Sequence, residues 1–308
     1  MQNTSQLLMI RPVNFGYNAE TAVNNAFQVN AGDPATQSKA LEEFDHFVEL
    51  LRHNGITVDV VNDTPEPFTP DSIFPNNWIS FHGPDQVVLY PMFADNRRAE
   101  RKQTVLDALR AKYEFATPVD LTPLENENEF LEGTGSMVLD RDAKICYACL
   151  SPRTSEEALD EFCRKMDYIP IVFEAVDQQG TEIYHTNVLM CVAAEYVVIC
   201  LDSIRDPEER LLVSDAITGS GKELIEISPA QMKRFAGNML QLVSNTGEKL
   251  LVMSDQAYAS LGGKQLEKLR SYNRILHASL NTIETNGGGS ARCMMAENFL
   301  RPLHKSGN

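Results

Sequence analysis

Five segments with helical periodicity recur about every 50–60 residues along this chain of 308 residues, and each lies between short apolar runs. The clearest segment spans 36–55, where Phe44, Val48 and Leu51 follow helical spacing and Gly55 is suited to end the helix. The other four segments are 97–113, 154–166, 206–218 and 261–272. A helix that returns at a regular interval between strands indicates repeated α/β units, and a propeller-like array would satisfy this rhythm.

The apolar runs between the helical segments have the length and composition of β-strands. They cover 56–61, 76–81, 86–92, 135–140, 144–150, 168–174, 188–193, 196–202, 224–228, 239–244, 249–254 and 279–285. No linker rich in Pro, Gly or Ser divides the chain. We therefore expect one α/β domain over residues 1–308.

The charge and apolar content exclude several classes of partner. A formal net charge of −16 argues against binding nucleic acid or an anionic membrane through a basic surface. No stretch approaches the roughly 18 apolar residues of a membrane span, and the N-terminal residues lack the basic start of a signal peptide. We expect a cytoplasmic protein with reduced cysteines and a small-molecule partner, and a homo-oligomer is compatible with the sequence.

Most of the six cysteines lie in apolar runs that are typical of a protein core. Cys146 and Cys149 have C-x-x-C spacing, but a strand through KICYACL would direct them to opposite faces, which disfavours a zinc or redox pair. Cys293 differs because it follows three consecutive glycines in NGGGSARC. Glycines lose much conformational freedom on folding, so such a run indicates close approach of the backbone to another group.

Two further residues stand beside glycines or at strand ends. His185 lies at the start of the apolar run in YHTNVLMCV, and Glu132 is followed by Gly133 and Gly135 in FLEGTGSMVLD. Taken alone, each fits a structural strand-end histidine or an exposed turn acid. Together with Cys293 they supply a thiol nucleophile, a base and an acid that orients the base.

These motifs resemble the signatures of the guanidino-group modifying enzymes. LEGTGS, YHTN and NGGGSARC are similar to the family's three catalytic stretches, and TPDSIFPNNWIS resembles the dimethylaminohydrolase segment in which an Asp precedes F-x-acid-acid. CLSPRTS resembles a stretch that ends in a substrate-binding arginine. The superfamily includes arginine deiminase, dimethylarginine dimethylaminohydrolase, amidinotransferases and succinylarginine dihydrolase. The sequence is most similar to the bacterial branch named citrulline utilization hydrolase.

The resemblance implies the pentein fold, an α/β propeller of five ββαβ units around a pseudo-fivefold axis with the active site in the central channel. It implies that Cys293 attacks the central carbon of a guanidinium or ureido group. It further implies that His185 protonates the leaving nitrogen and then activates water, while Glu132 orients His185. No metal or organic cofactor is implied.

The resemblance also implies a set of substrate-binding residues. Asp71 and Glu132 would hold the nitrogens of the substrate, and Arg153 with Arg97 would clamp its carboxylate, with Arg98 as the alternative to Arg97. The family's acidic positions carry amides here. Asn77 and its neighbour Asn76 occupy the F-x-acid-acid stretch, and Asn187 stands where arginine deiminase has an acid.

An amide carries no charge and offers two donors and an acceptor, so Asn77 and Asn187 favour a neutral ureido substrate such as citrulline, which would yield ornithine. Arginine deimination, arginine dihydrolysis and amidino transfer remain alternatives on the same scaffold. A ligand-binding protein without activity is a further alternative, which an intact set of Cys, His and Glu disfavours.

Overall fold

The strands form five three-stranded sheets with one shared pairing pattern within residues 1–303, which the computed structural model describes. In each sheet the middle strand pairs antiparallel with one neighbour and parallel with the other. The sheets are β16 (Ala296–Glu297), β1 (Gln6–Arg11) and β2 (Thr57–Asn62); β3 (Ile79–His82), β4 (Gln86–Leu89) and β6 (Val119–Asp120); β7 (Val138–Asp140), β8 (Ile145–Cys149) and β9 (Ile169–Phe173); β10 (Met190–Val192), β11 (Tyr196–Ile199) and β12 (Glu223–Glu226); and β13 (Leu240–Val243), β14 (Lys249–Ser254) and β15 (Arg274–Ala278). A further two-stranded sheet pairs β5 (Tyr113–Glu114) with β17 (Arg301–Pro302).

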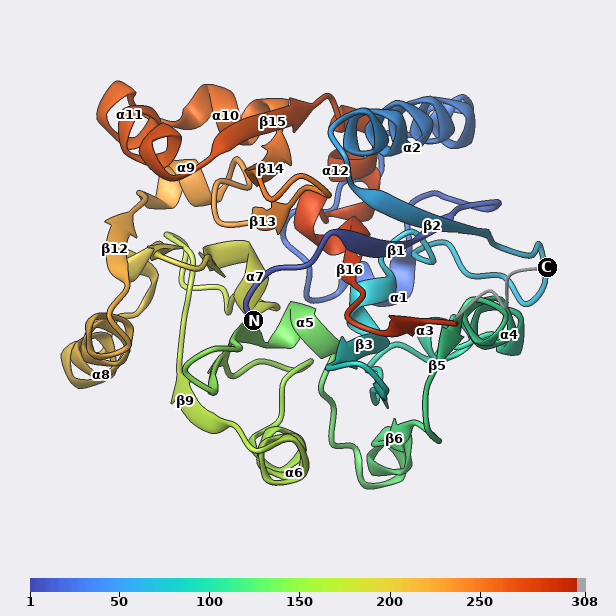
Figure 1. Cartoon of the computed structure of the whole chain (residues 1–308), viewed down its shortest axis with the longest axis horizontal. Helices are drawn as coiled ribbons and strands as arrows, with labels where there is room; N and C mark the ends of the chain where they lie inside the picture. Colours follow the sequence, from blue (N-terminus) through green and yellow to red (C-terminus); the bar gives the residue numbers. More distant parts are fainter. Residues whose placement is uncertain (304–308) are drawn as a thin grey trace.

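A longer helix connects the middle strand of each sheet to its parallel partner, because parallel strands need a crossover connection. These helices are α2 (Thr36–His53), α4 (Gln103–Arg110), α6 (Glu156–Met166), α8 (Pro207–Gly219) and α11 (Gly263–Tyr272). Figure 1 shows them on the outside of the molecule, with the sheets between them and the centre. The recurring helices that periodicity predicts are therefore present.

Shorter helical turns join these elements. They are α1 (Ala19–Ala22), α3 (Asp95–Arg98), α5 (Gly133–Ser136), α7 (Thr186–Leu189), α9 (Pro229–Met232), α10 (Asp255–Ser260), α12 (Asn281–Gly287), η1 (Pro75–Asn77), η2 (Thr122–Glu127), η3 (Leu201–Ser203) and η4 (Ala291–Met294). Within the described residues, no helix is both long and apolar enough to cross a membrane.

Two sequence predictions need correction, and two strands longer than two residues were not predicted. Residues 279–285 were expected to form a strand, but most of them lie in α12, whose first amides donate to the carboxylate of Glu43. The helix predicted over 97–113 is split into α3 and α4. Between them Lys102 has an extended backbone, and its ammonium group is buried against Asp63. Strands β1 and β15 were not predicted.

A turn precedes the antiparallel edge strand of every sheet and positions the site. The turns are η1 before β3, α5 before β7, α7 before β10, residues 237–239 before β13 and η4 before β16. Turn α5 contacts both η1 and α7, and η1 contacts η4. In Figure 1 the labels α5, α7, β3 and β16 lie near the centre of the molecule. Five segments far apart in the sequence therefore present side chains to a common region.

Candidate active site

The glycine run brings Cys293 into the interior. Gly288 ends α12 with φ +64°, and a Cβ added there would lie 2.5 Å from the Asn25 side chain. A Cβ at Gly287 would lie 2.8 Å from the Phe74 ring, and one at Gly289 would lie 3.0 Å from it. The backbone thus passes close to Phe74 and Asn25 before it enters η4, where Cys293 is 3% exposed. Close approach explains the three glycines.

Glu132 and His185 form a buried pair. Glu132 precedes α5 and His185 precedes α7, and the Nε2 atom of His185 lies 2.8 Å from Oε2 of Glu132. The backbone N–H of Phe93 donates to Oε1 of Glu132. A Cβ at Gly135 would collide with the Asn77 amide and lie 2.8 Å from Nδ1 of His185. Gly135 therefore allows the imidazole to sit directly against α5.

The charges of this pair follow from burial and from two arginines. Burial alone would raise the pKa of Glu132, but the charge of Arg153, the hydrogen bond and charge of His185 and the charge of Arg97 together lower that pKa to about 2. Burial lowers the pKa of His185 to about 4, against the opposing effect of Glu132. At neutral pH the acid is a carboxylate and the imidazole is neutral. With Nε2–H donating to Glu132, Nδ1 is left as the basic nitrogen.

Two amides contact the sulfur of Cys293. The Nδ2 atom of Asn238 lies 3.3 Å from Sγ, and Nδ2 of Asn187 lies 3.6 Å from it. No carboxylate oxygen is among the hydrogen-bond partners of this sulfur within residues 1–303. The direct hydrogen-bond partners of the nucleophile candidate are therefore polar and uncharged.

A narrow cavity brings most of the predicted site residues together. Its lining includes Cys293, His185, Asp71, Asn77, Arg97, Arg153, Thr21, Asn25, Phe74, Tyr184, Gly287 and Gly289. Asn187 reaches the cavity region through its contact with Cys293. Asn76 is outside this lining, and its amide nitrogen lies 3.4 Å from the hydroxyl of Thr134.

The two arginines of the cavity differ in their partners. Arg97 donates to both carboxylate oxygens of Glu100 and, through Nη1, to Oδ1 of Asn77 at 2.9 Å. Arg153 donates through Nε to Oδ1 of Asn24 at 2.8 Å and through Nη2 to the carbonyl of Thr21 at 2.7 Å. The Arg97 guanidinium is thus held by Glu100 and Asn77. The Arg153 guanidinium is held by Thr21 and Asn24, which lie in the N-terminal segment 18–29.

Arg98, the alternative to Arg97, points away from the cavity. Its guanidinium pairs with Asp95 and donates to the carbonyl of Met92. Because it is absent from the cavity lining, it has no direct access to a ligand held beside Cys293.

Two buried polar atoms of the cavity residues have no hydrogen-bond partner within the described chain. They are Nδ2 of Asn77 and Oδ1 of Asp71. The orientation of the Asn77 amide is defined because its Oδ1 accepts from Arg97. Burial raises the pKa of Asp71 despite the nearby charge of Arg97. Burial deprives this donor and this acceptor of their hydrogen bonds to water. A polar ligand in the cavity would replace those hydrogen bonds.

Sequence reasoning missed Asn238, Asn24 and Tyr184. The Tyr184 hydroxyl donates to the carbonyl of Gly288, which fixes the turn before η4. A signal for Asn238 was present in the dipeptide Gly237–Asn238, because a Cβ at Gly237 would collide with the carbonyl of Val188. Asn24 lies in a segment with no motif.

Within residues 1–303, no group of three or more His, Cys, Asp or Glu side chains is arranged to hold a metal ion. Cys146 and Cys149 are free and buried in different hydrophobic clusters, in agreement with the prediction that they point to opposite faces.

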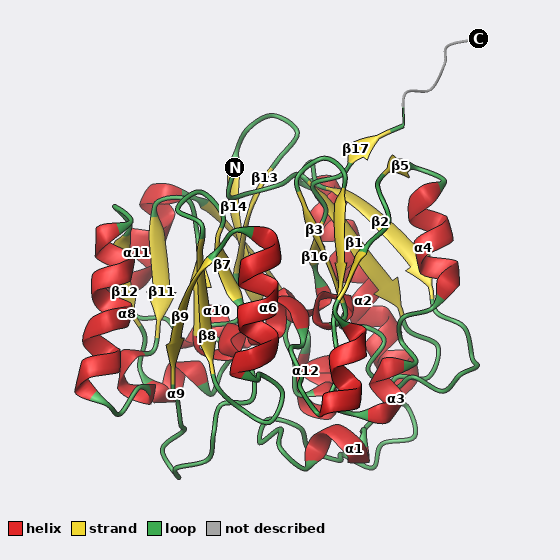
Figure 2. Ribbon diagram, turned by 90° about the horizontal axis from the view of Figure 1, so that it is seen from below, coloured by secondary structure: helices red, strands yellow, loops and turns green. Residues whose placement is uncertain are grey.

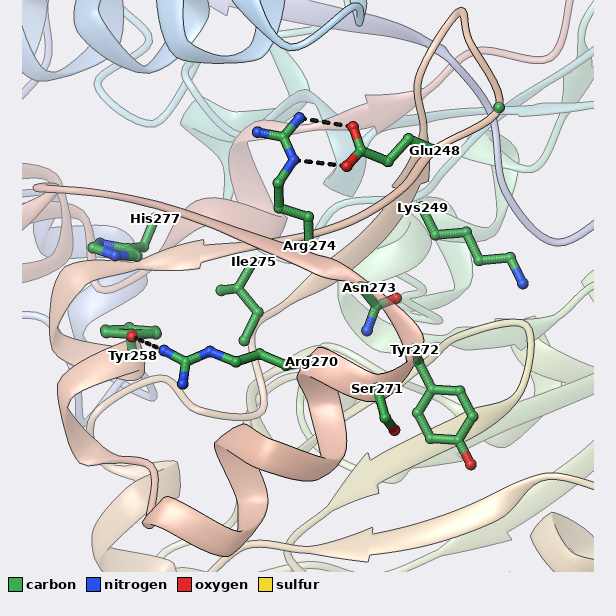
Figure 3. Close-up of a pocket in the computed structure, with 11 residues that line it drawn as sticks. Glu248, Lys249, Tyr258, Arg270, Ser271, Tyr272, Asn273, Arg274, Ile275 and His277 are labelled. Carbon is green, nitrogen blue, oxygen red and sulfur yellow. Dashed lines mark hydrogen bonds and ion pairs between the residues drawn. The ribbon is translucent and has the colours of Figure 1, made fainter.

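A larger depression lies beside β15, at the edge of its sheet (Figure 3). Its charged side chains are largely paired with neighbours: both oxygens of Glu248 accept from Arg274, and Arg270 donates to the Tyr258 hydroxyl. Its lining contains no cysteine. The nucleophile candidate is therefore confined to the narrow cavity.

Comparison with known proteins gives the family of the chain. The sequence matches the family described as N,N dimethylarginine dimethylhydrolase, eukaryotic, over residues 11–300. The chain belongs to this family. Membership places it in the guanidino-modifying pentein superfamily and makes it a hydrolase that acts on carbon–nitrogen bonds. At the level of class, the family supports a cysteine-dependent hydrolase of the guanidino-modifying superfamily.

Solved structures share the fold of this dimethylhydrolase family member at low sequence identity. The substrate-bound N-terminal domain of ArgZ, a cyanobacterial arginine dihydrolase of the ornithine–ammonia cycle, has 18% identity and a TM-score of 0.75, with 96% of this chain and 99% of that chain covered. Full-length ArgZ gives the same TM-score and identity with 97% of this chain covered, but the match spans only 41% of ArgZ.

A dimethylarginine dimethylaminohydrolase variant, as an adduct with S-methyl-L-thiocitrulline, has 14% identity and a TM-score of 0.65, with 96% of this chain and 100% of that chain covered. No curated protein is found to match the chain by sequence.

Proposed function

We propose that the protein hydrolyses the ureido group of citrulline or of a closely similar amino acid, with release of ornithine or its analogue. The unpaired Nδ2 donor of Asn77 carries this proposal. A ureido group has an oxygen that accepts a hydrogen bond, whereas a guanidinium has donors only, so only the ureido group would pair with this donor. The unpaired Oδ1 of Asp71 would accept from a substrate N–H in either case.

Cys293 is the proposed nucleophile. His185 lines the same cavity as Cys293, although no hydrogen bond joins the two side chains within the described chain. In the substrate complex, neutral His185 takes the thiol proton at Nδ1, and the sulfur adds to the ureido carbon while the ureido oxygen accepts from Asn77. The resulting imidazolium is stabilised by the carboxylate of Glu132, 2.8 Å from Nε2. It gives the proton to the leaving nitrogen, the carbon–nitrogen bond breaks, and a thiocarbamate remains on Cys293.

Water completes the cycle. His185, neutral again, removes a proton from water as the oxygen adds to the thiocarbamate carbon. Loss of the sulfur then gives carbamic acid, which decomposes to ammonia and carbon dioxide, and the thiol regains its proton. Acid and base functions thus reside in one imidazole whose low pKa keeps it neutral between steps.

The substrate carboxylate is assigned to Arg153. Its Nε and Nη2 donors now face oxygens of Asn24 and Thr21, an arrangement similar to a bidentate contact with a carboxylate. Arg97 is instead assigned the role of orienting the Asn77 amide, because its donors already face Glu100 and Asn77. Asn187 contributes to the neutral surroundings of the sulfur, and Asn76 supports η1 from outside the cavity.

We further propose that the five sheets close into the pentein propeller around this cavity, within the single domain predicted over residues 1–308. The shared pairing pattern supports this closure, as do the mutual contacts of the turns before β3, β7, β10 and β16.

A guanidino substrate, arginine or a methylated arginine, is the second candidate, and the family match favours it. Steady-state kinetics with citrulline, arginine and dimethylarginine distinguish the two, and a kcat/KM that is highest for citrulline is expected. Cys293→Ser should be folded and inactive on every substrate. A wild-type preference for arginine or dimethylarginine would reject the ureido proposal alone, whereas an active Cys293→Ser protein would reject the mechanism.

A further inference from the structure

The residues before the antiparallel edge strands supply a polar or reactive side chain to the site in four of the five sheets. Asn77 lies two residues before β3, Asn187 three before β10 and Cys293 three before β16. Gly135, three residues before β7, makes room for His185. Asn238 occupies the same position in the remaining sheet, two residues before β13.

The contacts of Asn238 aim its amide nitrogen at the sulfur of Cys293. The backbone N–H of Arg292 donates to its Oδ1 at 3.0 Å, which fixes the orientation of the amide. Its Nδ2 donates to the carbonyl of Asn187 at 2.9 Å and lies 3.3 Å from Sγ of Cys293. The side chain is fully buried, so water does not compete for these contacts.

We infer that Asn238 is a further catalytic residue, whose amide N–H donates to the Cys293 sulfur and stabilises its thiolate form. This inference rests on the proposed role of Cys293 as nucleophile. A neutral substrate brings no positive charge to the sulfur, so the protein has to stabilise the thiolate by its own groups. A hydrogen bond to a charged acceptor is stronger than one to a neutral acceptor, and therefore the Asn238 contact favours the thiolate over the thiol.

Alkylation by iodoacetamide tests this role without any substrate. The thiolate displaces iodide, so the rate follows the thiolate fraction of Cys293, and mass spectrometry of the peptide that contains Cys293 separates it from the five other buried cysteines. Asn238→Asp keeps the acceptor for Arg292 but directs a carboxylate oxygen toward the sulfur. We expect the pH of half-maximal alkylation to rise by about 1 to 3 pH units. Asn238→Ala, which lacks the donor, should shift it upward by a smaller amount.

Asn245→Asp, at an exposed position, is the matched control for added charge and should leave the profile unchanged. Coincident profiles for the wild type and the folded Asn238 variants would overturn the inference, while an inactive Cys293→Ser protein would still support the proposed function. If only one variant folds, its profile decides. If thermal unfolding shows that neither variant folds, Asn238 has a structural role and the inference fails.

Discussion

At the scale of single residues, the Glu132–His185 pair shows how a buried site keeps one charge and suppresses another. Both side chains are almost fully buried, and burial alone disfavours the charged form of each. Arg153 and Arg97 each approach Oε2 of Glu132 to 3.6 Å, so the carboxylate remains charged. The same two arginines oppose a proton on His185. The imidazole is thus uncharged at neutral pH, as the proposed mechanism requires of the group that accepts the thiol proton.

The low pKa of His185 predicts a pH-dependent stability. The folded pKa of about 4 lies below the ordinary value of 6.5, so between these values the unfolded chain binds a proton that the folded chain does not. The contribution of His185 to the free energy of unfolding should therefore fall as the pH falls from 6.5 toward 4, and this contribution is present in full above pH 6.5. Between about pH 7.5 and about pH 5 the contribution of His185 is on the order of 2 kcal/mol.

Urea unfolding of the wild type and His185→Gln at these two pH values measures that contribution. Glu132 does not contribute in this window, because its pKa of about 2 and its ordinary value of 4.5 both lie below it. The His185→Gln protein should lose less stability on acidification than the wild type. His46→Gln, at an exposed position on α2, should behave like the wild type. Equal pH dependence in wild type and His185→Gln would show that His185 titrates normally.

The donor of Asn77 predicts a second change at this scale. Asn77→Asp keeps the oxygen that accepts from Arg97 and replaces the unpaired N–H donor by an acceptor. Citrulline should lose one hydrogen bond and meet repulsion at its oxygen, so its kcat/KM should fall about 10- to 100-fold. The kcat/KM for arginine should rise in the same protein. Because both substrates are measured with one enzyme, a general loss of folding would lower both values and is distinguishable from the predicted reversal.

The candidate catalytic residues could be proposed from sequence because glycines accompany them. Gly288 and Gly135 mark points where a side chain would strike Asn25 or His185, and close approach leaves a trace in the residue types. Asn238 also follows a glycine, Gly237, but its role could not be inferred from that signal because the role depends on Arg292 and Cys293, more than 50 residues away in the chain. The partners of Arg97 and Arg153 also depend on contacts between distant segments, which sequence spacing does not reveal.

At the scale of elements, short helical turns carry the site while strands and long helices support them. Strands β7 and β10 were anticipated by their apolar runs, but the turns α5 and α7 before them were not separated from the strands. The reason is that these four-residue turns are stabilised by tertiary contacts: the Ser136 hydroxyl donates to the carbonyl of Arg153, and Thr186 donates to the carbonyl of Ser136. Helix α12 similarly depends on Glu43, whose carboxylate accepts from its first amides.

Turn α5 gives a prediction for Gly135→Ala. The added methyl group would meet Asn77 and Nδ1 of His185, both parts of the site, whereas the backbone conformation at Gly135 suits any residue. Displacement of His185 by a fraction of an ångström to about 1 Å should lower kcat about 100-fold. The protein should remain folded, because the atoms that have to move belong to two side chains and not to the backbone. Gly219→Ala, at the exposed end of α8 where no atom lies within 4 Å of the added carbon, is the control and should retain activity. An active Gly135→Ala enzyme would argue against His185 as the base.

At the scale of the whole molecule, the site lies where the turns of the five sheets meet, and the N-terminal segment 18–29 covers it. Asn18 donates to Asp71, and Asn24 accepts from Arg153. Gln28 donates to the carbonyl of Asn286, and the backbone N–H of Val29 donates to the carbonyl of Thr285 at 2.7 Å. In Figure 2, α1 lies with α12 on the side opposite the N-terminus. Thr21 and Asn25 of this segment are part of the cavity wall, so a ligand beside Cys293 would be in contact with the segment.

Hydrogen exchange should therefore report ligand binding through this segment. The amide of Val29 exchanges with solvent when its bond to Thr285 opens, and a ligand enclosed by the segment makes opening less favourable. With citrulline at about 100 times its Kd on the inactive Cys293→Ser protein, the closed state gains about 2.7 kcal/mol, so exchange at Val29 should slow about 100-fold. Amides in the middle of α8, which is far from the cavity, serve as the internal control and should keep their rates (Figure 1). If Val29 exchanges equally fast with and without citrulline while calorimetry shows binding, the ligand reaches the protein without closure of the segment.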